Sequence, residues 1–297
     1  MPDLAPTLLF IDTNIWLDFY RDRGDSAVKL LRSVERLRQR MIVTYQLEAE
    51  FKGNRQQVLM ESWRNLKVPT DFSVPNIVAD AATTRVLKGH LRDAKKHIDN
   101  LKKALVQVMC SPAKHDPVYQ LCQRIFHRQD NLVLSHDNDL RLDVRRKALR
   151  RFLHGYPPRK KNDTSLGDAF NWEWMIYCCA ARKSNLVVVT RDSDYGITLS
   201  DQSYPNDHLV QEFKERVGKR RKLILYSRLT DGLKHFNVPV TKKETAAEDE
   251  WIASSATDRE RCYPVKIIDT SVGAHNPSRV FLMPPVSLPG EEPGHEQ

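Results

Sequence analysis

Short apolar runs alternate with helix-like patterns along most of the chain. Four runs predict buried strands, at residues 8–11, 41–45, 186–189 and 222–226. Apolar side chains at helical spacing predict helices at residues 26–40, 46–66, 75–109, 115–127, 137–153, 165–181, 205–219 and 229–236. Strands that alternate with helices are typical of a parallel sheet, so the pattern predicts an α/β fold.

The predicted helices between residues 75 and 154 form a long helical insertion that is strongly basic. Residues 75–161 hold 19 Lys and Arg against 8 Asp and Glu, a surplus of 11 positive charges, and the whole chain has a surplus of 9. Such a field attracts polyanions, above all nucleic acids, although charge alone fits a solvated helix face equally well. The side chains that we expect to contact phosphates are Arg150, Arg151, Arg159, Lys160 and Lys161.

Composition excludes several classes of protein. No apolar run approaches the roughly 20 residues that span a bilayer. The first run ends after four residues at Asp12, so we expect neither a membrane anchor nor a signal peptide. The five cysteines form no Cys-x-x-Cys pair, which favours reduced thiols and a cytoplasmic location. Periodicity weakens near the end, and we expect residues 238–297 to form an extension with a poorly ordered tail.

Carboxylates stand close to the ends of the predicted strands. Asp12 and Asp192 come just after strands, whereas Glu50 and Asp168 lie near the starts of helices. Ligands of an open parallel sheet bind beyond the carboxyl ends of its strands, so these four acids can meet there. Asp194, two residues beyond Asp192, is a further candidate. Taken singly, each acid also fits a helix cap, a turn or a surface ion pair.

A cluster of these acids would need a counter-charge. Two carboxylates at about 4 Å repel by about 4 kcal/mol at an effective dielectric constant near 20. Oxygen ligands without Cys or His favour Mg²⁺ or Mn²⁺ over zinc. A divalent ion at such a site can activate water and polarise a phosphoryl group. A basic segment combined with an acidic metal site is what an enzyme that cleaves phosphodiesters requires.

At these residues the sequence resembles the PIN-domain nucleases, in particular the larger bacterial PIN-like proteins with a helical insertion. The resemblance covers residues 6–237 and includes a Tyr-Pro-Pro-Arg-Lys stretch at residues 156–160. Four acidic motifs occur in the family's order: Ile11-Asp12-Thr13-Asn14, Glu50 within Glu48-Ala49-Glu50-Phe51-Lys52, Gly167-Asp168-Ala169, and Thr190-Arg191-Asp192-Ser193-Asp194-Tyr195.

The resemblance implies a PIN-like nuclease domain at residues 1–237, with a doubly wound, mostly parallel sheet of strand order 3-2-1-4-5. It also implies a metal-dependent endoribonuclease that cleaves RNA with water activated by Mg²⁺ or Mn²⁺. The residues that it assigns to catalysis and metal binding are Asp12, Glu50, Asp168 and Asp192, with Asp194 as a fifth metal ligand. Side chains that could orient these ligands are Thr13, Asn14 and Thr190, although Asn14 fits a helix cap equally well.

Several alternatives stay open at this point. More than a hundred residues separate the second acid from the third, so the insertion could form an RNA channel, a homodimer interface or a contact with an inhibitory protein. A role as a toxin or defence effector rests on analogy. The rival functions are an inactive RNA-binding module of the same fold, a DNA-directed or small-phosphoester phosphohydrolase, and an interaction protein that docks an acidic partner.

Overall fold

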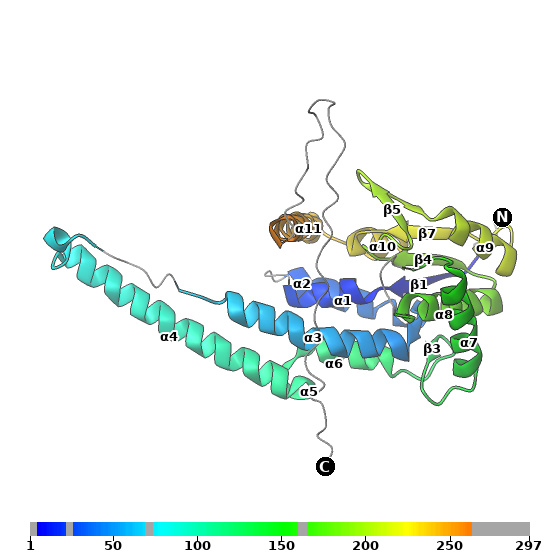
Figure 1. Ribbon diagram of the computed structural model, residues 1–297, viewed down its shortest axis with the longest axis horizontal. Coiled ribbons are helices and arrows are strands. Elements are labelled where there is room, and N and C mark those ends of the chain that lie inside the picture. The colour runs from blue at the N-terminus through cyan, green and yellow to red at the C-terminus, as the bar shows by residue number, and fades with distance from the viewer. Residues whose placement is uncertain (1–4, 22–25, 69–73, 160–164, 263–297) are drawn as a thin grey trace, which may run out of the picture. The chain divides into compact units, whose positions relative to one another are not determined.

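The computed structural model describes residues 5–21, 26–68, 74–159 and 165–262, and its two compact units are residues 1–255 and 256–297 (Figure 1). The strands are β1 (Thr7–Ile11), β2 (Val43–Thr44), β3 (Val133–Leu134), β4 (Asn185–Val189), β5 (Gly196–Leu199), β6 (Gln202–Pro205) and β7 (Leu223–Tyr226). The α-helices are α1 (Thr13–Arg21), α2 (Ser26–Glu35), α3 (Tyr45–Asn65), α4 (Ala82–Cys110), α5 (Pro112–His115), α6 (Pro117–Phe126), α7 (Leu140–His154), α8 (Gly167–Arg182), α9 (Asp207–Arg216), α10 (Leu229–His235) and α11 (Lys242–Cys262). Short 3₁₀ turns are η1 (Arg38–Arg40) and η2 (Asn76–Val78).

A parallel sheet of order β1-β4-β7 forms the centre of the first unit, which confirms the predicted α/β class. β2 and β3 form a second parallel pair. This pair is joined to β1 by a bridge between Leu9 and Met41, where the Ile42 amide donates to the Leu9 carbonyl at 2.8 Å. A continuous five-stranded sheet of order 3-2-1-4-5 stays a prediction.

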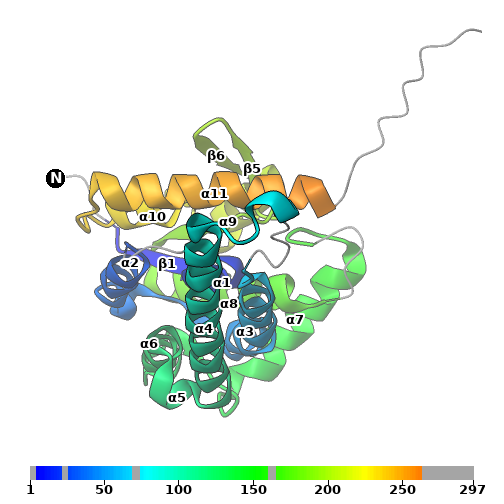
Figure 2. The ribbon, with the colours of Figure 1, turned by 90° about the vertical axis from the view of Figure 1, so that its left-hand side faces the viewer.

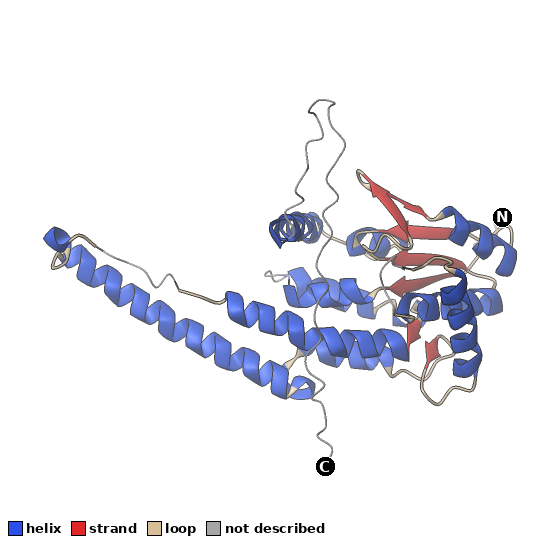
Figure 3. Ribbon diagram, viewed as in Figure 1, coloured by secondary structure: helices blue, strands red, loops and turns tan. Residues whose placement is uncertain are grey.

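The central strands are buried on both faces, as parallel strands covered by helices usually are. The side chains from Leu8 to Ile11 and from Leu186 to Val189 are at most 2% exposed. α8 packs against β2 and β4, and α10 packs against β4 and β7, so the strands lie between helices (Figure 3). The approach of α10 is so close that a Cβ atom on Gly232 would lie 2.7 Å from the Val189 side chain.

Strand register aligns the ends that carry the candidate acids. Ile11 pairs with Val189, and Val189 pairs with Tyr226, so these three strands end at one edge of the sheet. Asp12 continues this pairing, because its amide donates to the Val189 carbonyl at 3.0 Å. The residues that follow β1 and β4 are therefore neighbours in space.

The predicted helical insertion contributes partly to the core. α6 buries Leu121, Cys122, Ile125 and Phe126, and β3 pairs with β2. α4 is different, because Thr84 is the only one of its described residues that is buried. α4 lies beside α3 in both views (Figures 1 and 2), and in Figure 1 it extends past the end of α3. The segment thus combines a part integral to the fold with a largely exposed helix.

A buried ion pair joins α3 to the start of α6. Arg55 is 3% exposed and Asp116 is 1% exposed, and the Arg55 Nη2 atom donates to Asp116 Oδ2 at 2.5 Å. The same guanidinium donates to the Val108 carbonyl of α4 at 2.7 Å, and the Tyr20 hydroxyl donates to Asp116 Oδ2 at 2.9 Å. These contacts hold the C-terminal end of α4 against α3 and the start of α6.

Some elements are not apparent in the hydrophobic pattern, namely α1, β3, the β5-β6 hairpin and α11. The pattern beyond residue 239 predicted little regular structure, and α11 corrects that expectation. α11 begins with a capping box, in which Glu244 Oε2 accepts from the Thr241 amide at 2.7 Å and the Glu244 amide donates to Thr241 Oγ1 at 3.3 Å. The predicted tail from residue 263 lies outside the described residues. None of the described helices is long and apolar enough to cross a membrane.

Candidate active site

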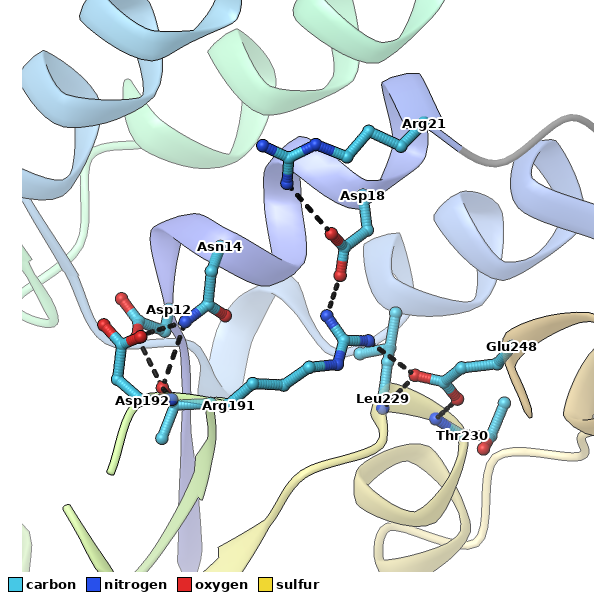
Figure 4. A network of polar contacts seen from close by, with 10 residues as sticks. Asp12, Asn14, Asp18, Arg21, Arg191, Asp192, Leu229, Thr230 and Glu248 are labelled. Atoms are coloured by element: carbon cyan, nitrogen blue, oxygen red, sulfur yellow. Dashed lines mark hydrogen bonds and ion pairs between the residues drawn. The ribbon is translucent and has the colours of Figure 1, made fainter. Parts of the chain in front are cut away.

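Asp12 stands between β1 and α1 and is only 3% exposed. Its carboxylate accepts hydrogen bonds from the Thr13 amide at 2.7 Å and from the Thr190 hydroxyl at 2.5 Å. It also accepts from Asn14 Nδ2 at 3.1 Å (Figure 4). Three donors around one buried carboxyl group fix its orientation at the carboxyl edge of the sheet. The parallel pairing of β1 with β4 creates this arrangement, because Asp12 follows β1, Thr190 follows β4, and the two strands end side by side.

The pKa of Asp12 is raised from 3.8 to about 7. Burial is the main cause, and the negative charge of Asp192 is the next. The hydrogen bonds from Thr190 and Thr13 act in the opposite direction, while Glu50 raises the pKa further. The carboxylate form of Asp12 is therefore costly in this environment unless a positive charge accompanies it.

Glu50 reaches the same region from α3. Its Oε2 atom accepts from the Thr13 hydroxyl at 3.0 Å and its Oε1 atom accepts from Gln46 at 2.9 Å. Thr13 thereby links the Glu50 carboxylate to the residue next to Asp12. Glu48 faces elsewhere, because it pairs with Lys52 at 2.6 Å and with His127 at 2.8 Å.

Asp168 lies in the first turn of α8, directly after Gly167. A Cβ atom on Gly167 would lie 2.0 Å from Glu50 Oε1, so a side chain there would displace the Glu50 carboxylate. The Gly167 amide donates to the Ser165 hydroxyl at 3.1 Å, which helps to fix the start of the helix. Glycine at this position lets the N-terminus of α8 approach α3 closely.

The Thr190 hydroxyl connects the acids that follow β1 and β4. It donates to Asp12 and accepts from the Asp192 amide at 3.0 Å, and Asn14 Nδ2 lies 3.3 Å away. Thr190 is 2% exposed, so this hydroxyl is shielded from water. The position of the Asp192 backbone is therefore set by the same group that binds Asp12. Asp194, two residues further on, is half-buried.

Tyr195 reports that the four acids share one region. Its side chain is 1% exposed, and its hydroxyl has no hydrogen-bond partner among the described residues. Burial raises the pKa of Tyr195 well above 10.0, and the next causes are the charges of Asp168, Asp12, Glu50 and Asp192, in that order. All four carboxylates thus act on a single buried hydroxyl.

These features fit a hard divalent cation. The available ligand atoms are oxygens, the Asp12 carboxyl group has a raised pKa, and the buried Tyr195 hydroxyl has no partner in the described part of the chain. The close approach at Gly167 also keeps space for the Glu50 carboxylate. Across the described ranges, however, no three Asp, Glu, His or Cys side chains form a group that could already hold a metal ion. The carboxylates lie in one region, but they are not close enough together to coordinate an ion as they stand.

The predicted phosphate-binding residues have different environments. Arg150 is exposed, and so is Arg159, although its guanidinium lies 4.3 Å from the centre of the Phe152 ring. Arg151 is a correction: it is 4% exposed, pairs with Glu173 at 3.0 Å and also pairs with Glu212. A buried guanidinium held by two carboxylates is not available to a nucleic acid. The other two predicted residues, Lys160 and Lys161, lie outside the described residues.

Two residues of the site were not among the sequence predictions. Gln46 lies four residues before Glu50, and this spacing places both on one face of α3. That spacing was a usable signal. Tyr195 gave no comparable signal, because an aromatic residue after an acidic motif fits a packed core equally well.

A family model described as a PIN domain matches residues 9–195, which is more than half of the chain and includes all four acids. The chain therefore belongs to the PIN-domain family. PIN domains are nuclease-type domains that act on nucleic acids and generally use divalent metal ions. Comparison with curated proteins and with solved structures found no match.

Proposed function

We propose that the protein is an endoribonuclease that hydrolyses phosphodiester bonds of RNA with Mg²⁺ or Mn²⁺. In this proposal Asp12, Glu50, Asp168 and Asp192 hold the ion, and Asp194 is a fifth ligand. The observation that carries the proposal is the buried Asp12 carboxyl group, whose pKa is raised to about 7 by burial and by neighbouring acids. A carboxyl group with this property binds either a proton or a cation. Because PIN domains generally use divalent metal ions, we infer that a cation binds here.

Each neighbour of the acids has a defined task. Thr190 and Asn14 hold the Asp12 carboxylate in place, and Thr13 orients Glu50. When bound, a divalent cation supplies an activated water and stabilises the charge that develops on the phosphate. Asp12 releases its proton when the cation binds, because a nearby positive charge lowers the pKa of a carboxyl group.

We propose that exposed basic residues hold the RNA backbone. Arg150 and Arg159 are exposed, and Lys160 and Lys161 follow them in the chain. Binding through phosphates should weaken steeply with salt. Arg150→Gln should reduce this salt dependence by about one phosphate contact, whereas a salt slope equal to that of the wild type would remove Arg150 from the interface. We further propose a cytoplasmic location, which is supported by the free thiols of Cys110, Cys122, Cys178 and Cys179.

The test compares Asp12→Asn and Asp192→Asn with Asp231→Asn, a control whose carboxylate pairs with Lys234 at 3.0 Å on α10. Cleavage of RNA, single-stranded DNA and a generic phosphodiester is measured with Mn²⁺ and with EDTA. We expect EDTA-sensitive RNA cleavage that falls at least about 100-fold in both site variants and stays unchanged in the control. Full activity in both site variants would refute the assignment.

Other outcomes identify the rival functions. Preferential cleavage of DNA or of the generic phosphodiester would replace the RNA proposal. RNA binding without cleavage would identify an inactive binding module. We also propose a toxin role, which predicts that induced expression arrests growth for the wild type but not for Asp12→Asn. The homodimer and the inhibitory protein are tested by mass measurement in solution and by co-purification.

A further inference from the structure

The residue between Thr190 and Asp192 connects the acidic site to the C-terminal helix. Arg191 pairs with Asp18 of α1 and, through its Nη2 atom, with Glu248 Oε1 of α11 at 3.4 Å (Figure 4). Its guanidinium also lies 4.8 Å from the centre of the Trp251 ring of α11. Arg191 is therefore held from two directions by elements on either side of it.

Glu248 joins three parts of the fold through one carboxylate. Its Oε1 atom accepts from the Leu229 amide at 2.7 Å, and its Oε2 atom accepts from the Thr230 amide at 2.9 Å. These amides belong to the first turn of α10. A carboxylate there accepts hydrogen bonds from N–H groups that have no partner within the helix, and its negative charge interacts favourably with the helix dipole. Because Glu248 is only 8% exposed, its bonds to α10 and to Arg191 are shielded from water.

The connection matters because Arg191 shares its backbone with two residues of the site. The Thr190 hydroxyl binds Asp12 at 2.5 Å, and the Asp192 amide donates to the same hydroxyl at 3.0 Å. A rotation of the backbone at residue 191 would move both groups. Displacements of about 1 Å at a reacting site can reduce a rate by about 100-fold.

The charge of Glu248 also matters. The Glu248 carboxylate balances the Arg191 guanidinium, which is attached to the segment that carries Asp192. Glu248 and Asp18 share this guanidinium, so loss of Glu248 would leave more of the positive charge of Arg191 to act on the neighbouring carboxylates and to oppose a bound cation. Displacement and competition both weaken cation binding.

We propose that Glu248 is a positioning residue of the active site, and that it holds the Thr190–Asp192 segment through Arg191. α11 lies beyond residues 9–195 that match the family, so this contact extends the site to a part of the chain outside that match. The inference rests on the proposed cation site. It assigns to α11 a role in cation binding as well as a role in packing.

The test uses the full chain with Glu248→Gln and with Glu244→Gln as a matched control. Glu244 lies on the same helix and is 6% exposed, but its carboxylate accepts hydrogen bonds from Thr241 instead of pairing with Arg191. Mn²⁺ affinity is measured by calorimetry, and hydrogen exchange of the segment from β4 to Tyr195 is measured in metal-free protein. Melting temperature, kcat and KM for RNA complete the set.

We expect Glu248→Gln to weaken Mn²⁺ affinity about 10-fold and to speed exchange at residues 190–192, since loss of an outer contact commonly costs 10- to 100-fold in metal affinity. We expect kcat to fall while KM for RNA is unchanged. Because Gln also completes a capping box, Glu244→Gln should change the melting temperature only slightly and keep Mn²⁺ affinity within about twofold of the wild type. Arg191→Lys should reproduce the loss of Mn²⁺ affinity. If Glu248→Gln does not fold, Arg191→Lys is used in its place.

Three outcomes would overturn the inference. The first is wild-type Mn²⁺ affinity in both Glu248→Gln and Arg191→Lys. The second is an equal loss in Glu244→Gln that follows melting temperature, which would show that α11 acts only through stability. In both cases, Mn²⁺ binding that Asp192→Asn abolishes leaves the proposed function intact. The third is a wild-type protein that binds no Mn²⁺, which overturns the proposed function together with the inference.

Discussion

The raised pKa of Asp12 predicts an unusual dependence of stability on pH in metal-free protein. Between about pH 4 and pH 7 the carboxyl group is ionised in the unfolded chain but still protonated in the folded one. The folded state binds more protons in this window, so the free energy of unfolding falls as pH rises. The shift from 3.8 to about 7 corresponds to a loss of about 4 kcal/mol, at about 1.4 kcal/mol per pH unit. Above pH 7 this loss is complete.

Asp12→Asn removes the titrating group and should remove this loss. We expect the free energy of unfolding of the variant to exceed that of the wild type at pH 8, by up to about 4 kcal/mol, and the two proteins to converge near pH 4. Urea unfolding in EDTA, followed by tryptophan fluorescence from pH 4 to pH 8, measures the difference. Saturating Mn²⁺ at 100 times its Kd should add about 2.7 kcal/mol to the wild type and little to the variant.

The difference profile decides the outcome, because other groups titrate in both proteins. Parallel curves for wild type and Asp12→Asn across the whole range would show that Asp12 ionises normally in the folded state. That result would refute the inference that burial and Asp192 make the site costly without a cation. Asp231→Asn serves as the control, and its curve should follow that of the wild type.

Three further substitutions test the packing around the site and the buried ion pair between α3 and α6. Gly167→Ala places a methyl group against the flexible end of the Glu50 side chain. We expect the melting temperature to change little and Mn²⁺ affinity to fall about 10-fold. Unchanged affinity would contradict the proposed role of Glu50. Tyr195→Phe removes a hydroxyl without a described partner, so metal-free stability should not decrease, and a loss of more than about 1 kcal/mol in urea unfolding would reveal a hidden hydrogen bond. Asp116→Asn leaves the buried Arg55 charge uncompensated and should cost about 3–5 kcal/mol in unfolding free energy, whereas a cost below about 1 kcal/mol would mean that the pair is hydrated.

The sequence was sufficient to predict the central strands and the elements that carry the acids. Runs such as residues 186–189 are short, apolar and β-branched, so they have few alternatives to a buried strand. The match of β1 to β4 then follows from topology, because adjacent parallel strands end at one edge. The convergence of Asp12, Glu50, Asp168 and Asp192 was expected from their places at strand and helix ends and from motif order. It stays a prediction, and the charges of all four acids raise the pKa of Tyr195.

Other features depend on contacts that a linear pattern does not contain. Arg151 lies in a basic run, but its partners Glu173 and Glu212 are distant in sequence, so charge counting assigned it to the surface. β3 has only two residues, too few to show a period of two. α11 is mostly polar and lacks a clear apolar stripe, although its capping box was a readable signal.

The ion pair between Arg55 and Asp116 divides the long stretch between Glu50 and Asp168 into two parts. These two parts should differ in how well they tolerate insertions, deletions and substitutions. Residues from Asp116 to Leu134 belong to the body of the domain, because α6 supplies core side chains and β3 completes a strand pair. The outer parts of α3 and α4 extend beyond this anchor, away from the strands (Figure 1). Evolution or protein engineering could therefore shorten, lengthen or exchange this projecting pair of helices while the sheet and the residues that follow β1 and β4 are retained.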